Sequence, residues 1–411
     1  MSAGPGGLFA DVDRVDGEME RGDAQRTIEL VRGMRDEFVA FASRLCEIES
    51  PTDRPETQAA VHAILGSALA ELGFDVRIVR ARRGGAQRSG DHLLASPAGR
   101  ARGVPTQLLV GHTDTVWPLG TLERMPVRIG DGRLFGPGTL DMKGGLTMAI
   151  FALRALRRLG VEPEVTPVLF LNSDEEVGSP DSKRHVRRLA RASSRALVLE
   201  PALGLDGRIK TTRKGVGRFE IVVQGKAAHA GLDPTAGASA IVELAHVIHR
   251  LDSLNDPERG TTLNVGLVDG GTRPNVVAAR ARASVDVRVT TVEEGHALEE
   301  KIRAIRPVTP GVTLKVDGGM GIRPLERTPR NARLWEYARV VGDTLGLSLR
   351  DGSAGGASDG NTTSQFTATL DGLGCVGDGA HADHEHIVIE DSLDRCALLA
   401  RLMLAPSRLG G

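Results

Sequence analysis

Residues 107–114 read Gln-Leu-Leu-Val-Gly-His-Thr-Asp, a short apolar run that leads directly into a histidine and an aspartate. Two later apolar runs end in a similar way: residues 165–171 lead into Asn-Ser-Asp-Glu-Glu, and residues 196–199 lead into Glu-Pro. Runs of this length and composition are typical of buried strands, and residues 142–159 between two of them have helical spacing. The alternation predicts an α/β domain built on a mixed, largely parallel sheet flanked by helices.

A second domain is predicted where this rhythm changes. Residues 276–290 alternate small apolar side chains with polar ones, the period-two pattern of a strand with one buried face. The full order that we expect is a strand at 217–224, a helix at 238–254, strands at 262–268 and 276–290, a helix at 292–305 and a strand at 312–316. This is the βαββαβ order of a ferredoxin-like domain. The glycines in residues 318–321 are interpreted as its exit linker.

The predicted organisation therefore has one domain inserted into another. We expect a helix at 27–49, ahead of the first strands. The expected divisions are a loose N-terminal segment at 1–26, a catalytic domain in two parts at 27–212 and 322–411, and the inserted domain at 213–321.

Composition and charge exclude several classes of protein. The 411 residues carry 52 Lys and Arg against 53 Asp and Glu, which gives no general positive field to attract nucleic acid. The three cysteines stand singly, so neither a disulfide framework nor a thiolate zinc site is indicated. The polar N-terminus and the lack of a long apolar run predict neither export nor a membrane span. We expect a cytoplasmic protein with no nucleic-acid and no membrane partner.

Histidine and carboxylates gather at one edge of the predicted sheet. Ligands bind outside the carboxyl ends of the strands in open α/β sheets, and three successive strand ends deliver His112, Glu175-Glu176 and Glu200 there. Asp141 adds a carboxylate in a Gly-rich turn before a helix. Donors of this kind without cysteine suit Zn²⁺, Mn²⁺ or Co²⁺ in a site that keeps a water. Asp114, two residues after His112, could fix the tautomer of that imidazole.

The C-terminal part offers further histidines but leaves the choice among them open. His381, His384 and His386 lie within one short segment, and spacing alone does not say which of them is a ligand. The nearby Gly-Leu-Gly-Cys-Val-Gly at 372–377 matches a dinucleotide-binding pattern only superficially, because no helix is expected to follow it. An oxidoreductase is therefore disfavoured.

Several segments together resemble the M20 family of dinuclear zinc peptidases and amidohydrolases, in particular its glutamate-carboxypeptidase-like branch. In chain order they are GHTDTVWP, GPGTLDMKGG, NSDEEVGS, VLEPA, GKAAHAGLDPTAGASA, GGMGIRPLERT, GGASDGN and GLGCVGDGAHADHE. The resemblance implies a catalytic α/β domain interrupted by a small dimerisation domain, and hence a homodimer.

The resemblance also implies roles for individual residues. Two Zn²⁺ per subunit, replaceable by Co²⁺ or Mn²⁺, would share Asp141. His112 and Glu200 would complete one metal, and Glu176 and His381 the other. Glu175 would be the general base that acts on the bridging water, and Asp114 a supporting catalytic residue.

Residues of the inserted domain and its exit are expected to meet the substrate. The resemblance implies that His229 reaches the active site of the partner subunit. The guanidinium of Arg323 matches a carboxylate in bidentate geometry, so we expect it to hold the carboxylate of the substrate. Asn275, Arg288 and Gly360 are further substrate-binding candidates.

These expectations define a metal-dependent hydrolase that cleaves an amide bond of a small substrate with a free carboxylate. A C-terminal amino acid, a dipeptide and an N-acyl amino acid all remain open as substrates. The alternative is a non-catalytic, metal-binding family member that acts in binding or assembly.

Overall fold

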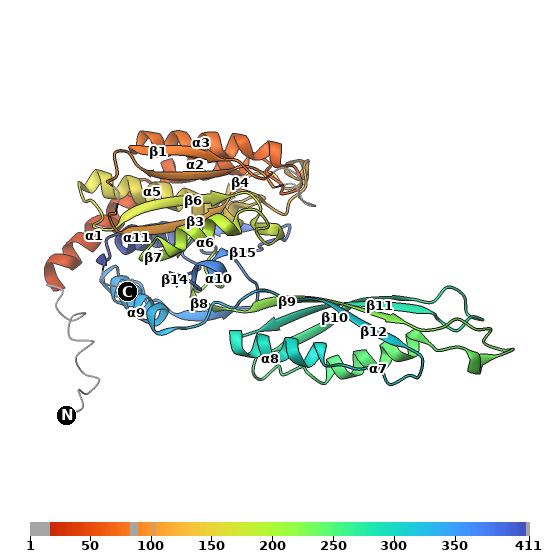
Figure 1. Ribbon diagram of the computed structural model, residues 1–411. Helices are drawn as coiled ribbons and strands as arrows, with labels where there is room; N and C mark the ends of the chain where they lie inside the picture. Colours follow the sequence, from red (N-terminus) through yellow and green to blue (C-terminus); the bar gives the residue numbers. More distant parts are fainter. Residues whose placement is uncertain (1–16, 83–88, 102, 408–411) are drawn as a thin grey trace, which may run out of the picture. The chain divides into compact units, whose positions relative to one another are not determined.

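The computed structural model describes residues 17–82, 89–101 and 103–407 (Figure 1). The chain forms two compact units. The first unit contains the described residues up to Thr211, Arg327–Gly352 and the described residues from Ser358 onwards, and the second contains Thr212–Glu326 with Ser353–Ala357. Of the N-terminal segment that we expect to be loose, residues 1–16 lie outside the described residues. Residues 17–26 are not loose, because they belong to the first helix.

The first unit is built on a six-stranded mixed sheet, as the sequence predicts. Its strand order is β1-β2-β6-β3-β7-β14. β3 pairs in parallel with β6 and β7, β14 pairs in parallel with β7, and β1 and β2 are antiparallel additions. The strands are β1 (Phe74–Val79), β2 (His92–Pro97), β3 (Thr106–His112), β6 (Thr166–Asn172), β7 (Arg195–Val198) and β14 (Ala368–Leu370).

Helices accompany this sheet, and short strands form smaller sheets beside it. The helices are α1 (Gly17–Gly33), α2 (Arg35–Cys46), α3 (Gln58–Glu71), α4 (Thr121–Arg124), α5 (Gly144–Leu159), α6 (Lys183–Arg191), α9 (Pro329–Thr344), α10 (Asp359–Thr363) and α11 (Ile389–Met403). One small sheet contains β4 (Arg128–Gly130), β5 (Arg133–Phe135), β15 (Gly377–Asp378) and β16 (His386–Val388). The other contains β8 (Ile209–Arg213) and β13 (Asp351–Ala354).

Burial on both faces explains why β3 reads as a continuous apolar run. All seven residues of β3 are buried. Leu109 packs into the larger core with residues of α5 and α11, whereas Leu108 and Val110 pack into a separate core with residues of α6. The strand therefore holds its carboxyl end, and His112 with it, between two layers of helices.

The helix predicted over residues 27–49 is two helices. α1 ends at Gly33 and α2 begins at Arg35, with the buried Met34 between them. Glycine is among the poorest helix formers, so the chain can turn there while the apolar residues of both helices still reach the core. The periodicity of the sequence continues across the break, which is why it suggests one helix.

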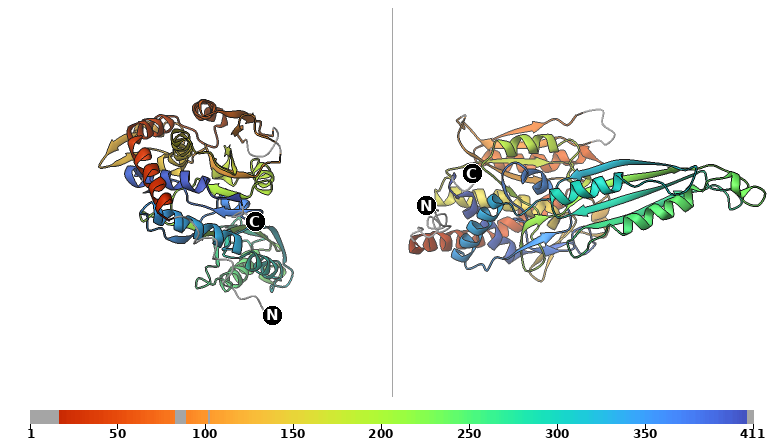
Figure 2. Two further views of the ribbon diagram at one scale, coloured as in Figure 1. Left: turned by 90° about the vertical axis from the view of Figure 1, so that its left-hand side faces the viewer. Right: turned by 60° about the horizontal axis from the view of Figure 1, so that its bottom comes forward.

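The second unit has the predicted ferredoxin-like order. Its elements are β9 (Gly215–Gln224), α7 (Ala240–Asp252), β10 (Thr262–Gly270), β11 (Arg280–Val289), α8 (Val292–Arg303) and β12 (Thr313–Ile322). The sheet order is β10-β11-β9-β12 with every pair antiparallel, and both helices cover the same face (Figures 1 and 2). Alternate residues of β11 are buried, although the strand begins at Arg280 rather than at residue 276.

The glycines of residues 318–321 form part of a strand, so their interpretation as an exit linker is wrong. β12 continues through them, and Gly318 and Gly319 pair with Phe219 and Arg218 of β9. Gly318 has a φ of +93°, and a Cβ there would lie 2.1 Å from the backbone oxygen of Arg218. Glycine is required because the two strands approach too closely for a side chain.

Candidate metal centre

His112 stands at the carboxyl end of β3 and is almost fully buried. Its Nδ1 lies 2.9 Å from the backbone oxygen of Asp114 and 3.5 Å from Oδ1 of the same residue. These acceptors favour a proton on Nδ1, which leaves the lone pair of Nε2 for a metal. Nε2 faces Asp141 Oδ1 at 3.1 Å and Glu200 Oε1 at 3.6 Å.

Asp141 lies in η3 (Thr139–Lys143), an irregular turn before α5 whose dihedral angles are not helical at this residue. One carboxylate oxygen of Asp141 faces His112, and the other lies 3.3 Å from His381 Nε2. His381 Nε2 is also 3.3 Å from Glu176 Oε2. Asp141 therefore stands between two histidines that come from distant parts of the chain.

The predicted ligands form two groups that share Asp141. His112, Asp141 and Glu200 make one group, and Asp141, Glu176 and His381 make the other. In each group the potential ligand atoms lie within 4.8 Å of one another. Glu176 Oε1 is buried and has no hydrogen-bond partner among the described residues, which is costly unless something binds there. The donor set and this unsatisfied oxygen both fit metal ions.

Asp114 supports the site through its carboxylate. It accepts hydrogen bonds from the Thr52 hydroxyl at 2.8 Å and from the backbone N–H groups of Glu175 and Glu176 at 3.3 and 3.2 Å. Burial raises the pKa of Asp114, but hydrogen bonds with His112 and Thr52 lower that pKa more, so it stays below its usual value. Asp114 thus fixes the backbone of the two adjacent glutamates.

Glu175 belongs to neither group of ligands. It is half-buried in η4 (Glu175–Val177), next to Glu176. Burial, followed by the negative charge of Glu200, raises the pKa of Glu175 well above its usual value. A carboxylate beside these groups that is not one of the candidate ligands would be available for proton transfer.

The charge of the metal-free site is balanced by protonated histidine. Hydrogen bonds with Asp141 and Glu176 raise the pKa of His381 to about 10. Burial raises the pKa of Glu176 to about 7. A metal must displace protons from these groups, so metal affinity should fall as the pH falls.

Four predicted site residues belong to the second unit. His229 and Asn275 are both exposed. They lie near each other, because His229 forms a β-bridge with Val276 and the Ala230 N–H donates to the Asn275 backbone oxygen. Arg288 and Arg323 lie toward the opposite end of the sheet, because Arg288 and Ile322 both pair with Val216. Arg288 holds Asp286 through two hydrogen bonds of 2.7 and 3.1 Å. Their part in substrate binding stays a prediction.

Gly360 is in the first unit, at the start of α10, and is buried. Its N–H donates to Ser358 Oγ at 2.9 Å, and a Cβ would lie 2.2 Å from Asp371 Oδ2. Packing against Asp371 is enough to require glycine here. A contact with substrate stays a prediction.

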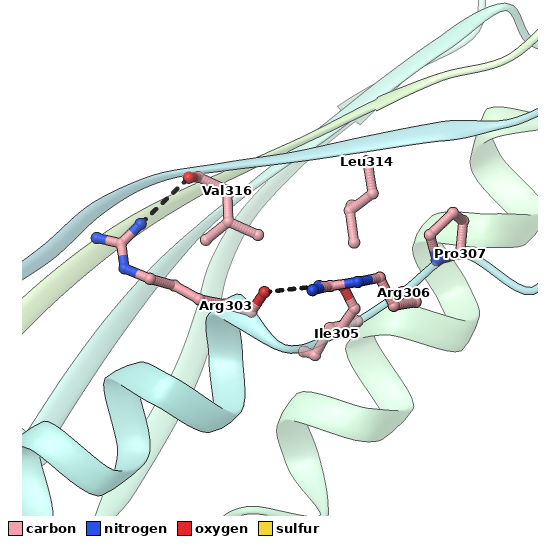
Figure 3. Close-up of a pocket in the computed structure, with 6 residues that line it drawn as sticks. All are labelled: Arg303, Ile305, Arg306, Pro307, Leu314 and Val316. Carbon is pink, nitrogen blue, oxygen red and sulfur yellow. Dashed lines mark hydrogen bonds between the residues drawn. The ribbon is translucent and has the colours of Figure 1, made fainter.

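A cavity in the second unit has no residue suited to catalysis. It is lined by Arg303, Ile305, Arg306, Pro307, Leu314 and Val316 (Figure 3). The two guanidinium groups are engaged by the protein: Arg306 donates to the Arg303 backbone oxygen at 2.8 Å, and Arg303 donates to the Val316 backbone oxygen at 3.5 Å. The candidate active site is therefore the group of side chains around Asp141.

Asp359 and Thr52 also belong to the site, although no sequence pattern points to either of them. Asp359 is buried, accepts a hydrogen bond from Ser179 Oγ at 2.9 Å, and its negative charge contributes to the raised pKa of Glu175. Burial raises the pKa of Asp359 itself to about 7. The Ser-Asp-Gly segment at 358–360 is visible in the sequence, but nothing in its spacing links it to Glu175.

Comparisons with known proteins identify the family of this chain. Residues 108–405 match the peptidase family M20/M25/M40. The chain is 30% identical to carboxypeptidase G2 of Pseudomonas sp. (strain RS-16) over 370 residues, which cover 88% of this chain and 87% of the relative. It is 28% identical to acetylornithine deacetylase of Myxococcus xanthus over 324 residues, which cover 75% and 82% of the two chains.

A solved structure gives the same picture of the fold. Aminopeptidase PepT from Bacillus cereus ATCC 10987 superposes with a TM-score of 0.75 at 22% identity, over 90% of this chain and 98% of that one. The matching family and the carboxypeptidase and deacetylase relatives indicate a hydrolase of the metallopeptidase type. This chain belongs to the M20 peptidase family, whose members are metal-dependent, and acts on amide bonds in the manner of a carboxypeptidase or deacetylase.

Among residues 17–82, 89–101 and 103–407, we find no helix with the length and apolar character that a membrane span requires.

Proposed function

We propose that this protein hydrolyses the amide bond of a small substrate that carries a free carboxylate, such as a dipeptide, a C-terminal amino acid or an N-acyl amino acid. The observation that carries the proposal is the pair of ligand groups that share Asp141, with the non-ligand Glu175 beside them. A shared carboxylate between two sets of ligands is the arrangement of two-metal hydrolases.

The metals that we propose are two Zn²⁺ ions. His112, Asp141 and Glu200 would hold one ion, and Asp141, Glu176 and His381 would hold the other. When bound, such ions act as Lewis acids toward the scissile carbonyl and lower the pKa of an attacking water. Imidazole and carboxylate donors without thiolates also accept Co²⁺ and Mn²⁺.

Glu175 is proposed as the general base and acid. It takes a proton from the attacking water and passes that proton to the nitrogen of the leaving amine. Burial and the negative charge of Glu200 both raise the pKa of Glu175, which makes it a stronger base for the first transfer. Asp114 holds the backbone of Glu175 in place through a hydrogen bond of 3.3 Å.

Three residues of the second unit are proposed to recognise the substrate, with Arg323 holding its carboxylate and Asn275 and Arg288 assisting. Gly360 of the first unit is proposed to assist as well. His229 is proposed to act in a homodimer, on the active site of the partner subunit. The Gly231 and Leu232 backbone N–H groups donate to His229 Nδ1 at 3.2 and 3.1 Å, so the neutral ring carries its proton on the outer Nε2. An Nε2–H donor suits stabilisation of a developing oxyanion.

The surface of the second unit supports a homodimer. β10 is an edge strand of the sheet, and Leu267 and Val268 on it are 71% and 59% exposed. Ile241 and Val242 at the start of α7 are also exposed, and Ile241 lies close to Gly270 of β10. An exposed edge with apolar side chains is a favourable place for a second copy of the chain to pair.

The experiment that tests the function is a substrate screen. Zinc-loaded protein should release amine from at least one class among dipeptides, N-acetyl amino acids and N-acyl glutamates, and the Glu175→Ala variant should not. Bound metal without turnover of any class would favour a non-catalytic binding protein instead.

A further inference from the structure

Glu385 is a buried carboxylate that belongs to neither ligand group. Its exposed fraction is 0%. Oε1 accepts hydrogen bonds from the backbone N–H groups of Leu140 and Asp141, each at 2.9 Å. Oε2 accepts from the Gly138 N–H and from the indole N–H of Trp117, each at 2.8 Å. Four donors occupy its two oxygens, so this carboxylate is engaged by the protein and not by a metal.

Three of these donors come from the turn that carries the shared ligand. Asp141 has φ −116° and ψ 93° inside η3, so the turn does not have the regular hydrogen bonds of a helix. Its buried N–H groups need acceptors, and Glu385 supplies them from a position 244 residues later in the chain. Charge-assisted hydrogen bonds of this kind are stronger than neutral ones and offset the cost of burying the carboxylate.

The same residue is close in sequence to a ligand of the second group. His381 is four residues earlier, and the turn between them is closed by hydrogen bonds of 2.9 Å from the Glu385 N–H to the Ala382 oxygen and 2.8 Å from the Ala382 N–H to the Gly379 oxygen. The Gly136 N–H also donates to the Glu385 backbone oxygen at 3.2 Å. Glu385 therefore joins the turn of Asp141 to the turn of His381, whose side chains face each other at 3.3 Å.

We propose that Glu385 is a positioning residue for the metal centre: it fixes the shared ligand Asp141 relative to His381, and thereby sets metal affinity. The inference deepens the proposed function and rests on it, since it assumes that these side chains bind metal. Groups that orient metal ligands typically contribute about 10- to 100-fold to affinity. Glu385 orients Asp141 through its backbone rather than through its side chain.

The test is the Glu385→Gln variant. Glutamine keeps one oxygen acceptor, but its NH₂ group would meet the N–H donors of Gly138 and Trp117. The hydrogen bonds from these two donors are therefore lost. We expect zinc affinity, measured by competition with a chromophoric chelator, to fall about 10- to 100-fold. The visible spectrum of the Co²⁺-loaded variant should also change, because the shared ligand Asp141 is displaced with its turn.

Two matched variants separate positioning from general destabilisation. Glu243→Gln in the second unit removes another buried carboxylate that accepts backbone N–H bonds, from Val308 and Thr309, and should leave zinc affinity as in the wild type. Trp117→Phe removes the one donor to Glu385 that is not part of the Asp141 turn, and should also keep the affinity.

Thermal unfolding gives a readout that does not depend on activity. For a positioning residue, the increase in melting temperature on adding zinc should be smaller in Glu385→Gln than in the wild type. Equal increases, together with unchanged affinity and an unchanged Co²⁺ spectrum, would overturn the proposal. If Glu385→Gln does not fold, Glu385→Asp, which keeps the charge but withdraws the carboxylate, decides by the same three measurements.

Failure of this inference is distinguishable from failure of the proposed function. A wild-type protein that binds zinc but hydrolyses no amide contradicts the function and leaves the inference standing. A Glu385→Gln variant that binds zinc like an active wild type contradicts only the inference. A wild type that binds no metal contradicts both.

Discussion

The edge of the first unit's sheet and the His229 loop of the second unit hold their polar side chains in opposite ways. His112, Asp114 and Glu200 are buried, and hydrogen bonds or close charges fix each of them. His229 is exposed, and only its Nδ1 is bound within its own unit. Metal ligands need a preorganised, sheltered setting, whereas a residue that serves a substrate or a second subunit must be accessible. The contrast fits the proposed division of roles, in which residues of the first unit carry out the chemistry and residues of the second unit recognise the substrate.

The largest effect is expected from Glu175 in the first unit. Glu175→Ala should lower kcat by about 10²- to 10⁴-fold, because it removes the proton-transfer group, while zinc content stays at the wild-type level. Glu176→Ala should instead lose metal. Steady-state kinetics together with elemental analysis checks both. The assignment is reversed if Glu175→Ala loses metal and Glu176→Ala keeps it.

His229 in the second unit should rank next. His229→Ala is expected to lower kcat by about 10²- to 10³-fold, the usual loss for one oxyanion donor, without loss of zinc. Kinetics and elemental analysis of the purified variant measure this. A variant with normal kcat would contradict the proposed role, since the exposed histidine would then serve no catalytic step.

The same pair of residues tests whether His229 acts in trans. When inactive Glu175→Ala and His229→Ala proteins are mixed and exchange subunits, each mixed dimer should contain one site with an intact base and a partner histidine. We expect part of the activity to return. Exchange demonstrated with differently tagged subunits but without recovered activity would rule out action across the dimer.

Arg323 sharpens the contrast between chemistry and recognition. Arg323→Ala should raise KM for a carboxylate substrate by about 10- to 100-fold, corresponding to a charged hydrogen bond of about 1.5–3 kcal/mol, with a smaller change in kcat. The matched measurement uses the same substrate with its carboxylate converted to an amide. If KM for the two substrates changes equally, Arg323 does not hold the carboxylate.

The smallest effect is expected from His62, a buried histidine of the first unit whose Nε2 lies 3.0 Å from Thr113 Oγ1. Burial, followed by the charge of His92, lowers the pKa of His62 to about 4. In the unfolded chain the histidine binds a proton below its pKa of about 6.5, whereas in the folded protein it stays neutral down to about pH 4. The free energy of unfolding therefore decreases as the pH falls from about 6.5 to about 4.

His62→Gln should remove this part of the pH dependence, which is at most about 2–3 kcal/mol at the acid end of the window. Urea unfolding of metal-free protein at pH 7 and pH 5 measures it, with His249→Gln on α7 as the baseline for loss of an exposed histidine. An unchanged difference between the two pH values in His62→Gln would show that His62 does not cause it.

Local patterns in the sequence were sufficient to predict the fold of each of the two units. The apolar run of β3 predicts a strand buried on both faces, and the alternation in β11 predicts a strand buried on one face, because side-chain direction is fixed by the strand itself. The same patterns fail where close packing of the backbone overrides the usual preference of glycine for loops. The glycines at 318 and 319 suggest a linker, yet both extend β12, and at residue 318 only glycine fits against the backbone of β9.

The sequence by itself also determined which residues are candidate ligands at the ends of β3, β6 and β7, since parallel strands deliver their carboxyl ends to one edge. Spacing alone left His381, His384 and His386 equivalent, and the resemblance to the M20 family favoured His381. Only the tertiary structure placed His381 Nε2 against Asp141 and Glu176, and only it brought Glu385 to the backbone of the Asp141 turn. Periodicity reports the direction of each side chain relative to its own element, whereas a contact across 244 residues depends on how whole elements pack.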